Sequence, residues 1–574
     1  MLLLSSDWIR VFVLIQVCVI GLCEEVVETR LSNGSPLRGY IIKRGPRIVH
    51  TYRGIPFARP PVGKLRFQKP QTDLEPWTEP MNFTRPKPAC PGGNRVEAAE
   101  FEVSEDCLYI DVYIDPGCKN TTCTIGVDLQ GSSSTILPDS MVINHSRSDP
   151  ELMVFIGHRF GAFGFLDVGN ELPDSPYNVG LYDLIEGLKW IKREAANFHG
   201  DPTRISTNAL RDLASMFHHL LVSPAIDRDE ISLSVQMLNN HRPLVQPHFS
   251  LDGSMKLLKR LGINRLRCLR EKSMDEIWDN SPPDFEFGVQ ADSYLLPAQS
   301  YVELVENWKP TSLFTISPAD FPYWADQGKN ANVLCKTYAS YMFGYKSDSV
   351  IERCVDYYSD NPKAPGIIGS HAVHALNSLL GSLNKQMAGK TYAAVFAQPG
   401  HDGGTVRLLF ADSKPETVAD HKVHEWMLAT REAFGHQRTR PAEDFEAVNE
   451  KGENFYFMRS IVADDNVTLI EKPQMHVGEI FESDAVRFWL VELARLDSNE
   501  TRPKVVQKVM RNFVRFYPNE MTKDSVNHSM AIWLFGTLFT VLVMFVLFKG
   551  NNKWRSSRGQ EKRPIYPPTY HSIS

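Results

Sequence analysis

Several common metal-site motifs are missing from this sequence. It contains no H-E-x-x-H pair, no paired C-x-x-C motifs and no EF-hand loop. His218 and His219 are adjacent on a predicted helix and point to different sides, which argues against a shared metal ion. We therefore predict no metal site and no cofactor.

A basic patch of the nucleic-acid-binding kind is missing as well. The net charge is −6, and the lysines and arginines are not interleaved with aromatic residues. Nucleic acid is therefore not an expected partner. The chain has 574 residues, 43% of them hydrophobic, which is enough for a large core.

Two apolar segments lie near the ends of the chain. Residues 1–23 hold Arg10 followed by an apolar run, the pattern of a signal peptide. Residues 530–548 are nineteen uncharged residues, about 28 Å as a helix and enough to cross a bilayer. Six cations and one acid follow in the predicted cytoplasmic tail, 549–574. These flanking charges argue against a buried core helix or a cleaved anchor signal, so we predict a type I single-pass protein of the plasma membrane.

The predicted extracellular side carries glycosylation signals and a polar connector. Residues 496–529 are polar and are predicted to form a stalk above the membrane. Seven N-x-S/T sequons all lie on the predicted luminal side: Asn33, Asn82, Asn120, Asn144, Asn466, Asn499 and Asn527.

The cytoplasmic tail ends with a short proline motif. Pro567, Pro568 and Tyr570 fit the PPxY ligand of WW domains, which predicts a WW-domain protein as a partner. The alternative is a chance match, because four-residue motifs arise easily in biased tails.

Hydrophobic patterns in the rest of the chain indicate an α/β protein. Leu152–Ile156 and Ala393–Phe396 are short apolar runs typical of buried strands. Leu181–Ala195 has apolar residues at helical intervals, which predicts an amphipathic helix. Strands alternating with helices favour a central sheet covered on both faces.

Five ordered blocks carry a family resemblance. They read YRGIPFARPPVGKLRF (52–67), EDCLYIDVY (105–113), HRFGAFGFL (158–166), NVGLYD (178–183) and KWI (189–191). Together they resemble the type-B carboxylesterase and cholinesterase family from about residue 25 to about residue 495. The resemblance implies one large α/β-hydrolase ectodomain at 24–495, with a large mixed central sheet flanked by helices.

The resemblance also bears on the cysteines. It implies a disulfide between Cys90 and Cys107, at positions similar to the family's first disulfide. The remaining cysteines are close enough in sequence for two local pairs, although spacing alone does not decide connectivity: Cys118 with Cys123, and Cys335 with Cys354. Cys268 is then left as the odd thiol, because Ile263 stands where the family has its usual partner.

The run from Phe198 to Pro224 places an arginine where the family carries its nucleophile. It resembles, without a gap, the segment that reads F-G-G-D-P, G-E-S-A-G and H-L-L-S-P. Arg211 stands at the serine of the nucleophile elbow. Arginine keeps its proton at physiological pH and offers no lone pair for attack. The small residues expected on either side are Ala209 and Leu213, so we predict a reshaped elbow and a pseudoenzyme.

The stretch that resembles the family's oxyanion loop is altered too. That loop reads H-G-G-G or Y-G-G-G in the family, and its backbone N–H groups stabilise the charge that develops in acyl transfer. Here Gly131 is kept, and Ser132 and Ser133 replace the following glycines. Side chains restrict the backbone conformations that glycine allows, which weakens such a site without abolishing it.

Two further positions match the family's acid and histidine. Asp320 stands for the acid, and His401 matches the histidine loosely. One interpretation is ordinary surface polarity of loop residues. The other is an ion pair between Asp320 and Arg211 that fills the former pocket, since a buried cation needs such a partner.

A hydrolase domain without its serine, on a type I anchor, resembles the non-catalytic adhesion branch of the family, which includes neuroligins, gliotactin and neurotactin. That resemblance implies binding of an extracellular or cell-surface protein, with a homodimer as one form. One alternative is a small-molecule or hormone binder that uses the vestigial gorge. The other is an esterase with a relocated nucleophile: Ser206, Ser215 or one of Ser132, Ser133 and Ser134.

Overall fold

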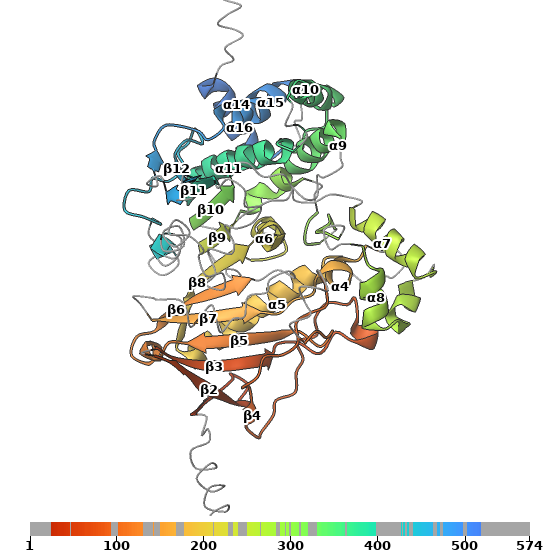
Figure 1. Ribbon diagram of the computed structural model, residues 1–574, viewed down its shortest axis with the longest axis vertical. Helices are drawn as coiled ribbons and strands as arrows, with labels where there is room; N and C mark the ends of the chain where they lie inside the picture. Colours follow the sequence, from red (N-terminus) through yellow and green to blue (C-terminus); the bar gives the residue numbers. More distant parts are fainter. Residues whose placement is uncertain are drawn as a thin grey trace, which may run out of the picture. The chain divides into compact units, whose positions relative to one another are not determined.

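A mixed β-sheet runs through the described part of the chain (Figure 1). The computed structural model describes residues 25–517 except 46, 93–101, 130–141, 143–149, 168–176, 211, 228–233, 239–248, 264–265, 283–286, 293, 298–299, 309–311, 319–329, 362–363, 365, 398–425, 427–428, 431–432, 435–439, 463–467, 471–473 and 498–501. Within these residues the sheet has fourteen strands: β1 Val26–Arg30, β2 Pro36–Arg44, β3 Arg47–Pro56, β4 Met81–Asn82, β5 Tyr109–Ile114, β6 Cys123–Leu129, β7 Glu151–Ile156, β8 Gly200–Leu210, β9 Ser234–Leu238, β10 Ser312–Pro318, β11 Lys390–Ala397, β12 Phe455–Val462, β13 Thr468–Ile470 and β14 Gln474–His476.

The sheet changes from antiparallel to parallel along its width. Its order is β1-β2-β3-β5-β7-β6-β8-β9-β10-β11-β12-β13, and β4 and β14 pair with β2 and β12. The neighbours β1, β2, β3, β5 and β7 pair antiparallel in that order, and the neighbours β7, β6, β8, β9, β10, β11 and β12 pair parallel. Both strands expected from sequence lie within the sheet, in β7 and β11. The predicted α/β class with a mixed sheet is confirmed.

Helices connect the parallel strands, because a parallel crossover needs a long connection. In Figure 1, α5, α6 and α11 lie over the sheet. The helices are α4 Gly161–Phe165, α5 Val179–Glu194, α6 Asp212–Val222, α7 Phe249–Arg260, α8 Met274–Asn280, α9 Ala331–Lys336, α10 Asp348–Ser359, α11 Ile368–Gln386, α14 Ser483–Arg487, α15 Leu493–Leu496 and α16 Lys504–Phe516. Short 3₁₀ or π turns occupy η1 Gly63–Leu65, η2 Pro116–Lys119, η3 Ala195–Phe198, η5 Leu266–Glu271, η7 Tyr301–Asn307, η9 Thr337–Met342 and η10 Phe488–Glu492. The helix expected at residues 181–195 corresponds to α5, whose apolar side is buried.

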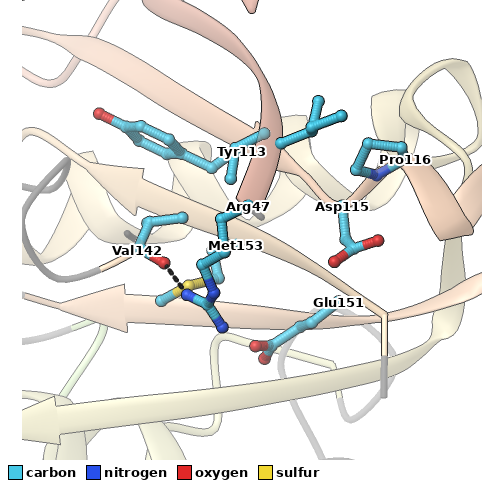
Figure 2. Close-up of a pocket in the computed structure, with 9 residues that line it drawn as sticks. Arg47, Tyr113, Asp115, Pro116, Val142, Glu151 and Met153 are labelled. Atoms are coloured by element: carbon cyan, nitrogen blue, oxygen red, sulfur yellow. Dashed lines mark hydrogen bonds between the residues drawn. The ribbon is translucent and has the colours of Figure 1, made fainter. Parts of the chain in front are cut away.

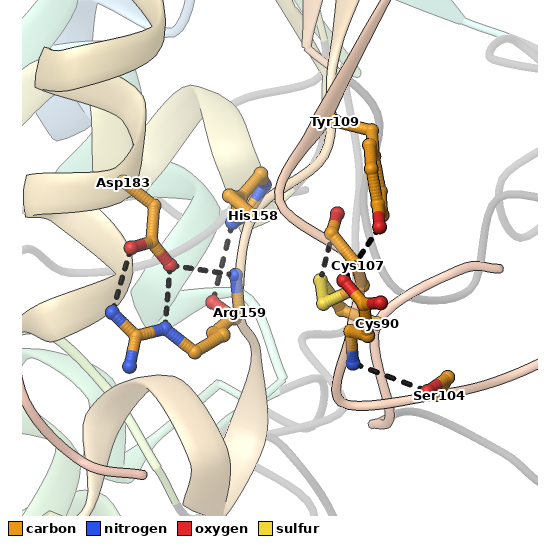
Figure 3. Close-up of a disulfide and its surroundings, with 8 residues drawn as sticks. Cys90, Ser104, Cys107, Tyr109, His158, Arg159 and Asp183 are labelled. Carbon is orange, nitrogen blue, oxygen red and sulfur yellow. Dashed lines mark hydrogen bonds and ion pairs between the residues drawn. A yellow bond between two sulfur atoms is a disulfide. The ribbon is translucent and has the colours of Figure 1, made fainter. Parts of the chain in front are cut away.

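A buried arginine fixes the start of α5 against the loop after β7. Arg159 Nε and Nη2 donate to the two carboxylate oxygens of Asp183 at 2.8 and 2.7 Å, and its backbone N–H donates at 3.0 Å (Figure 3). Both residues are buried, so the two charges need each other. Gly164 and Gly180 pack against the Arg159 carbonyl, which an added Cβ would approach to 2.3 and 2.5 Å. Arg159 and Gly164 of the segment 158–166 therefore pack directly against Gly180 and Asp183 of the segment 178–183.

A second buried arginine joins distant loops. The Arg66 guanidinium pairs with the Glu105 carboxylate, its Nε donating at 2.6 Å. Its Nη1 also donates to backbone carbonyls, that of Leu269 within η5 at 3.0 Å and that of Lys272 just after η5 at 2.6 Å. These bonds hold η5, which contains Cys268, against the N-terminal part of the sheet. Cys268 is a free thiol among the described residues.

Three disulfides are present, and Figure 3 shows the first of them. They join Cys90 to Cys107, Cys118 to Cys123 and Cys335 to Cys354. The pairing of Cys90 with Cys107 is the one that the resemblance implied, and the other two are the local pairs. The second and third disulfides each lie within one local stretch, around η2 and between α9 and α10.

The folded region extends beyond the predicted boundary at residue 495. The described residues up to Val514 belong to one compact unit, and α16 buries Val506, Val509, Met510 and Phe513. The segment expected to be a polar stalk therefore begins with a packed amphipathic helix, a pattern that its many polar residues obscured. Among the described residues, no helix combines the length and apolar character needed to cross a bilayer. The predicted signal peptide, membrane segment 530–548, tail 549–574 and PPxY residues lie outside them.

Candidate functional site

The junction between β8 and α6 is the predicted nucleophile elbow. Strand β8 ends at Leu210 and α6 begins at Asp212, so a single residue separates strand from helix. A nucleophile elbow lies between a strand and the helix that follows it. Arg211 is that single residue and itself lies outside the described part of the chain. The strand and helix on either side agree with what the family resemblance implied, and the reshaped elbow at Arg211 stays a prediction.

The strands that precede the two altered segments lie side by side. Leu129, the last residue of β6, pairs with Ala209 of β8. In the sequence, Gly131, Ser132 and Ser133 follow shortly after the end of β6. These three residues are outside the described ranges, and the proposed oxyanion loop stays a prediction.

The acid and histidine positions follow two other parallel strands. β10 ends at Pro318 and β11 ends at Ala397, and Pro318 pairs with Phe396. Asp320 and His401 come shortly after these strand ends in the sequence. Because parallel strands share a carboxyl edge, and ligands of such sheets bind there, the carboxyl ends of β6, β8, β10 and β11 lie along one edge. Both residues lie outside the described part, so their pairing with Arg211 stays a prediction.

A buried polar pair that the sequence analysis missed lies just before this edge. Asn208 Nδ2 of β8 donates to Asp128 Oδ1 of β6 at 3.0 Å, and both side chains are buried. Asp128 and Asn208 lie opposite each other in the two strands, one residue before the pair of Leu129 and Ala209. An isolated aspartate in an apolar strand was the available signal, but only the strand order shows its partner.

The described serine of β8 is a poor candidate for a relocated nucleophile. Ser206 is 3% exposed, and its Oγ has no hydrogen-bond partner among the described residues. A serine nucleophile needs a base within hydrogen-bond reach to remove its proton. Ser215 lies on α6, and nothing about its side chain is described.

Below the elbow, α6 is buried on nearly every side. Leu213 and Ala214 of its first turn are buried, as are His218 and His219 further along. The His218 ring meets Trp308 edge to face at 5.9 Å. Complete burial lowers the pKa of His218 to about 3, and the adjacent His219 adds to the shift. His218 is therefore a neutral core residue at physiological pH.

The burial of His218 predicts an acid-sensitive core. At a pH between the usual histidine pKa of 6.5 and the folded value of about 3, His218 binds a proton in the unfolded chain but not in the folded chain. Stability therefore falls as the pH drops below 6.5, and this group should cost about 2 kcal/mol between pH 7 and pH 5. His218→Phe, which keeps an aromatic ring against Trp308, should remove that part of the loss. Urea unfolding of both proteins at the two pH values measures it; equal pH dependence would contradict the assignment.

A cavity of about 340 Å³ lies at the end of the sheet where the parallel strand β7 begins (Figure 2). Arg47 at the start of β3, Asp115 just after β5 and Glu151 at the start of β7 line it. Arg47 Nη1 donates to the Val142 carbonyl at 2.7 Å. Burial lowers the pKa of Arg47, and the Asp115 carboxylate opposes that shift. This cavity is not the predicted gorge, since it lies at the amino ends of the parallel strands.

Comparison with known protein families identifies the chain. The profile described as "Carboxylesterase family" matches residues 24–367, more than half of the sequence. The chain belongs to the carboxylesterase family. Membership implies the α/β-hydrolase fold, in agreement with the mixed sheet.

Individual relatives match over shorter stretches. "Acetylcholinesterase 4" of Caenorhabditis briggsae is 29% identical over 289 residues, covering 46% of each chain. "Cholinesterase" of Mus musculus is 31% identical over 287 residues, covering 46% of this chain and 45% of the relative. "Carboxylesterase 1D" of Rattus norvegicus is 29% identical over 262 residues, covering 41% and 44%. The chain therefore spans less than half the length of these relatives, and all three carry the names of esterases.

Proposed function

We propose that this member of the carboxylesterase family is catalytically inactive and acts at the cell surface by binding another protein outside the cell. The observation that carries the proposal is Arg211, the single residue between β8 and α6. A guanidinium at this position cannot attack a carbonyl, whatever its orientation, because it has no lone pair to donate.

The neighbourhood of Arg211 supports the same conclusion. Leu213 is buried in the first turn of α6, at a position where the family resemblance expects glycine. Serine replaces glycine at residues 132 and 133 in the loop that would stabilise the transition state. The elbow and the oxyanion loop have thus changed together, which is unlike a single inactivating substitution in an otherwise intact site.

The sequence at the two ends supports the cellular placement. A signal peptide at 1–23, a membrane segment at 530–548 and a basic tail at 549–574 describe a type I plasma-membrane protein. A domain held outside the cell without catalysis has binding as its remaining role. The partner is proposed to be an extracellular or cell-surface protein, with a homodimer as one assembly and a WW-domain protein as the ligand of Pro567, Pro568 and Tyr570.

Restoring the serine alone should not restore esterase activity. Arg211→Ser leaves the buried Leu213 and the serine loop in place, and loss of one oxyanion donor alone costs about 10²–10³ in rate. We expect no hydrolysis of p-nitrophenyl acetate above the buffer rate by either the natural chain or this variant. Turnover by the natural chain would overturn the proposal. Turnover only after Arg211→Ser would show that the rest of the site had remained competent.

Cell aggregation tests the binding half of the proposal. Cells that display the full chain should aggregate with cells that express the partner, or with each other if the partner is a second copy. Arg211→Ser should aggregate to the same extent, since the proposed role needs no catalysis. No aggregation with any cell type, together with a thermal shift caused by a lipophilic small molecule, would favour the gorge-binding alternative instead.

Glycosylation provides an independent test of the extracellular placement. Three predicted acceptors are described and exposed, Asn33, Asn82 and Asn120. Replacing each by glutamine should raise the electrophoretic mobility of the protein from mammalian cells in one step per site. Treatment with a peptide N-glycosidase should remove the differences. An untreated triple variant that co-migrates with the natural chain would show that these sites are not used. Asn144, Asn466, Asn499 and Asn527 lie outside the described part and stay predictions.

A further inference from the structure

The outer side of α16 carries a row of positive charges. Lys504, Lys508 and Arg511 are exposed, and the helix contains no aspartate or glutamate. At 100° and 1.5 Å per residue, the three cations lie within about 60° around the axis and along about 10 Å of its length. We call these three residues the α16 stripe.

The charges of the stripe are not neutralised within the described structure. None of the three forms an ion pair with a residue that the structure describes. The one side-chain hydrogen bond among them stays within the helix, from Arg511 Nε to the Gln507 carbonyl at 3.2 Å. A chain with a net charge of −6 therefore carries, on one helix face, a cluster of cations that no described acidic side chain pairs with.

The opposite side of α16 holds the stripe in place. Val506, Val509, Met510 and Phe513 are buried. A Cβ added to Gly452 would lie 2.7 Å from the Phe513 ring, which shows how closely that ring packs on the Gly452 backbone. Gln507 Nε2 donates to the Arg502 carbonyl at 2.7 Å and ties the first turn to the preceding segment. The cations are thus presented on a packed helix.

We propose that the α16 stripe is a docking site for a linear sulfated polysaccharide of the glycosaminoglycan type. Such a chain presents sulfate and carboxylate groups at regular intervals, which complements a straight row of lysines and arginines. Basic clusters of this kind attract polyanions through the summed field of their charges. The inference rests on the proposed extracellular placement, where sulfated polysaccharides are the abundant polyanions.

Other occupants fit the helix less well. An amphipathic helix binds a bilayer by burying its apolar face in the lipid, but the apolar face of α16 is buried in the protein. A protein interface usually centres on buried aromatic or other large anchors surrounded by a polar rim. The outward side of the helix carries only cations along its first three turns, with Asn512 and Gln507 at its margins. A polyanion requires no such apolar centre.

Heparin binding by the purified full-length protein in detergent tests the proposal. The stripe variant is Lys504→Gln/Lys508→Gln/Arg511→Gln. The matched control is Lys64→Gln/Lys259→Gln/Lys385→Gln, which removes the same charge from exposed lysines on three other elements. At about 0.15 M salt we expect the stripe variant to bind heparin at least about tenfold more weakly and the control to change less than about twofold. Desulfated heparin should not bind the natural chain.

Two results would overturn the proposal. One is an equal loss of affinity in both variants, which would indicate a response to total charge. The other is unchanged heparin binding by a stripe variant that has the same melting temperature as the natural chain. This is also the result expected if a second copy of the chain covers α16. The assay uses purified protein and no cell partner, so its failure would leave the proposed adhesion role intact. Failure of cell aggregation would equally leave heparin binding untouched.

Discussion

Arg159→Leu is expected to lower the free energy of unfolding by about 3–5 kcal/mol. The change leaves the Asp183 carboxylate buried, with no cation and without the two guanidinium donors that now hold it at 2.8 and 2.7 Å. A buried charge without its partner carries a desolvation penalty that nothing offsets. Urea unfolding of the full protein measures the loss.

Two comparisons make this prediction specific. The double variant Arg159→Leu/Asp183→Leu should recover a large part of the stability, because it removes both charges. Arg38→Leu breaks an exposed pair with Glu28 and should cost less than about 1 kcal/mol. An Arg159→Leu effect no larger than that of Arg38→Leu would show that the buried pair does not organise the loop after β7.

The second large effect is expected from Gly164→Ala. A Cβ at this position would lie 2.3 Å from the Arg159 carbonyl oxygen, a backbone atom that Asp183 holds in place through the adjacent N–H. Overpacking costs about 1–3 kcal/mol where neighbours can move, and we expect the upper end or more here because backbone must shift. The melting temperature should fall by several degrees.

Gly288→Ala is the matched control for that substitution. An added Cβ at Gly288 meets nothing within 4 Å, and its backbone needs no left-handed conformation. The same chemical change should therefore leave the melting temperature nearly unchanged. A similar fall in both variants would point to a general loss of glycine flexibility, and no fall in Gly164→Ala would contradict the packing described around Arg159.

The sequence predicted the parts of this protein that short patterns encode. The apolar run at 152–156 and the helical spacing at 181–195 became β7 and α5, because local periodicity reports which side of an element is buried. The strand and helix on either side of position 211 were implied by the family resemblance of the run between Phe198 and Pro224. These features depend on neighbours in the chain.

Features that depend on distant contacts were not predictable in the same way. The hydrogen bond from Asn208 to Asp128 follows from β6 and β8 lying side by side, which no short pattern specifies. The packing of α16 was missed for a related reason: its four buried apolar residues are separated by cations, and the segment was expected to be a stalk. The sequence of a helix does not show which part of the protein will cover its apolar side.

Active-site labelling tests the central claim most directly. The purified full-length protein is incubated with a fluorophosphonate probe, beside a mammalian cholinesterase as a positive control, and labelled serines are located by mass spectrometry. The absence of a serine at position 211 predicts no covalent adduct on any serine of this chain, while the control is labelled to completion. An adduct at Ser206, Ser215 or any of Ser132 to Ser134 would show that a nucleophile survives and would contradict the non-catalytic account.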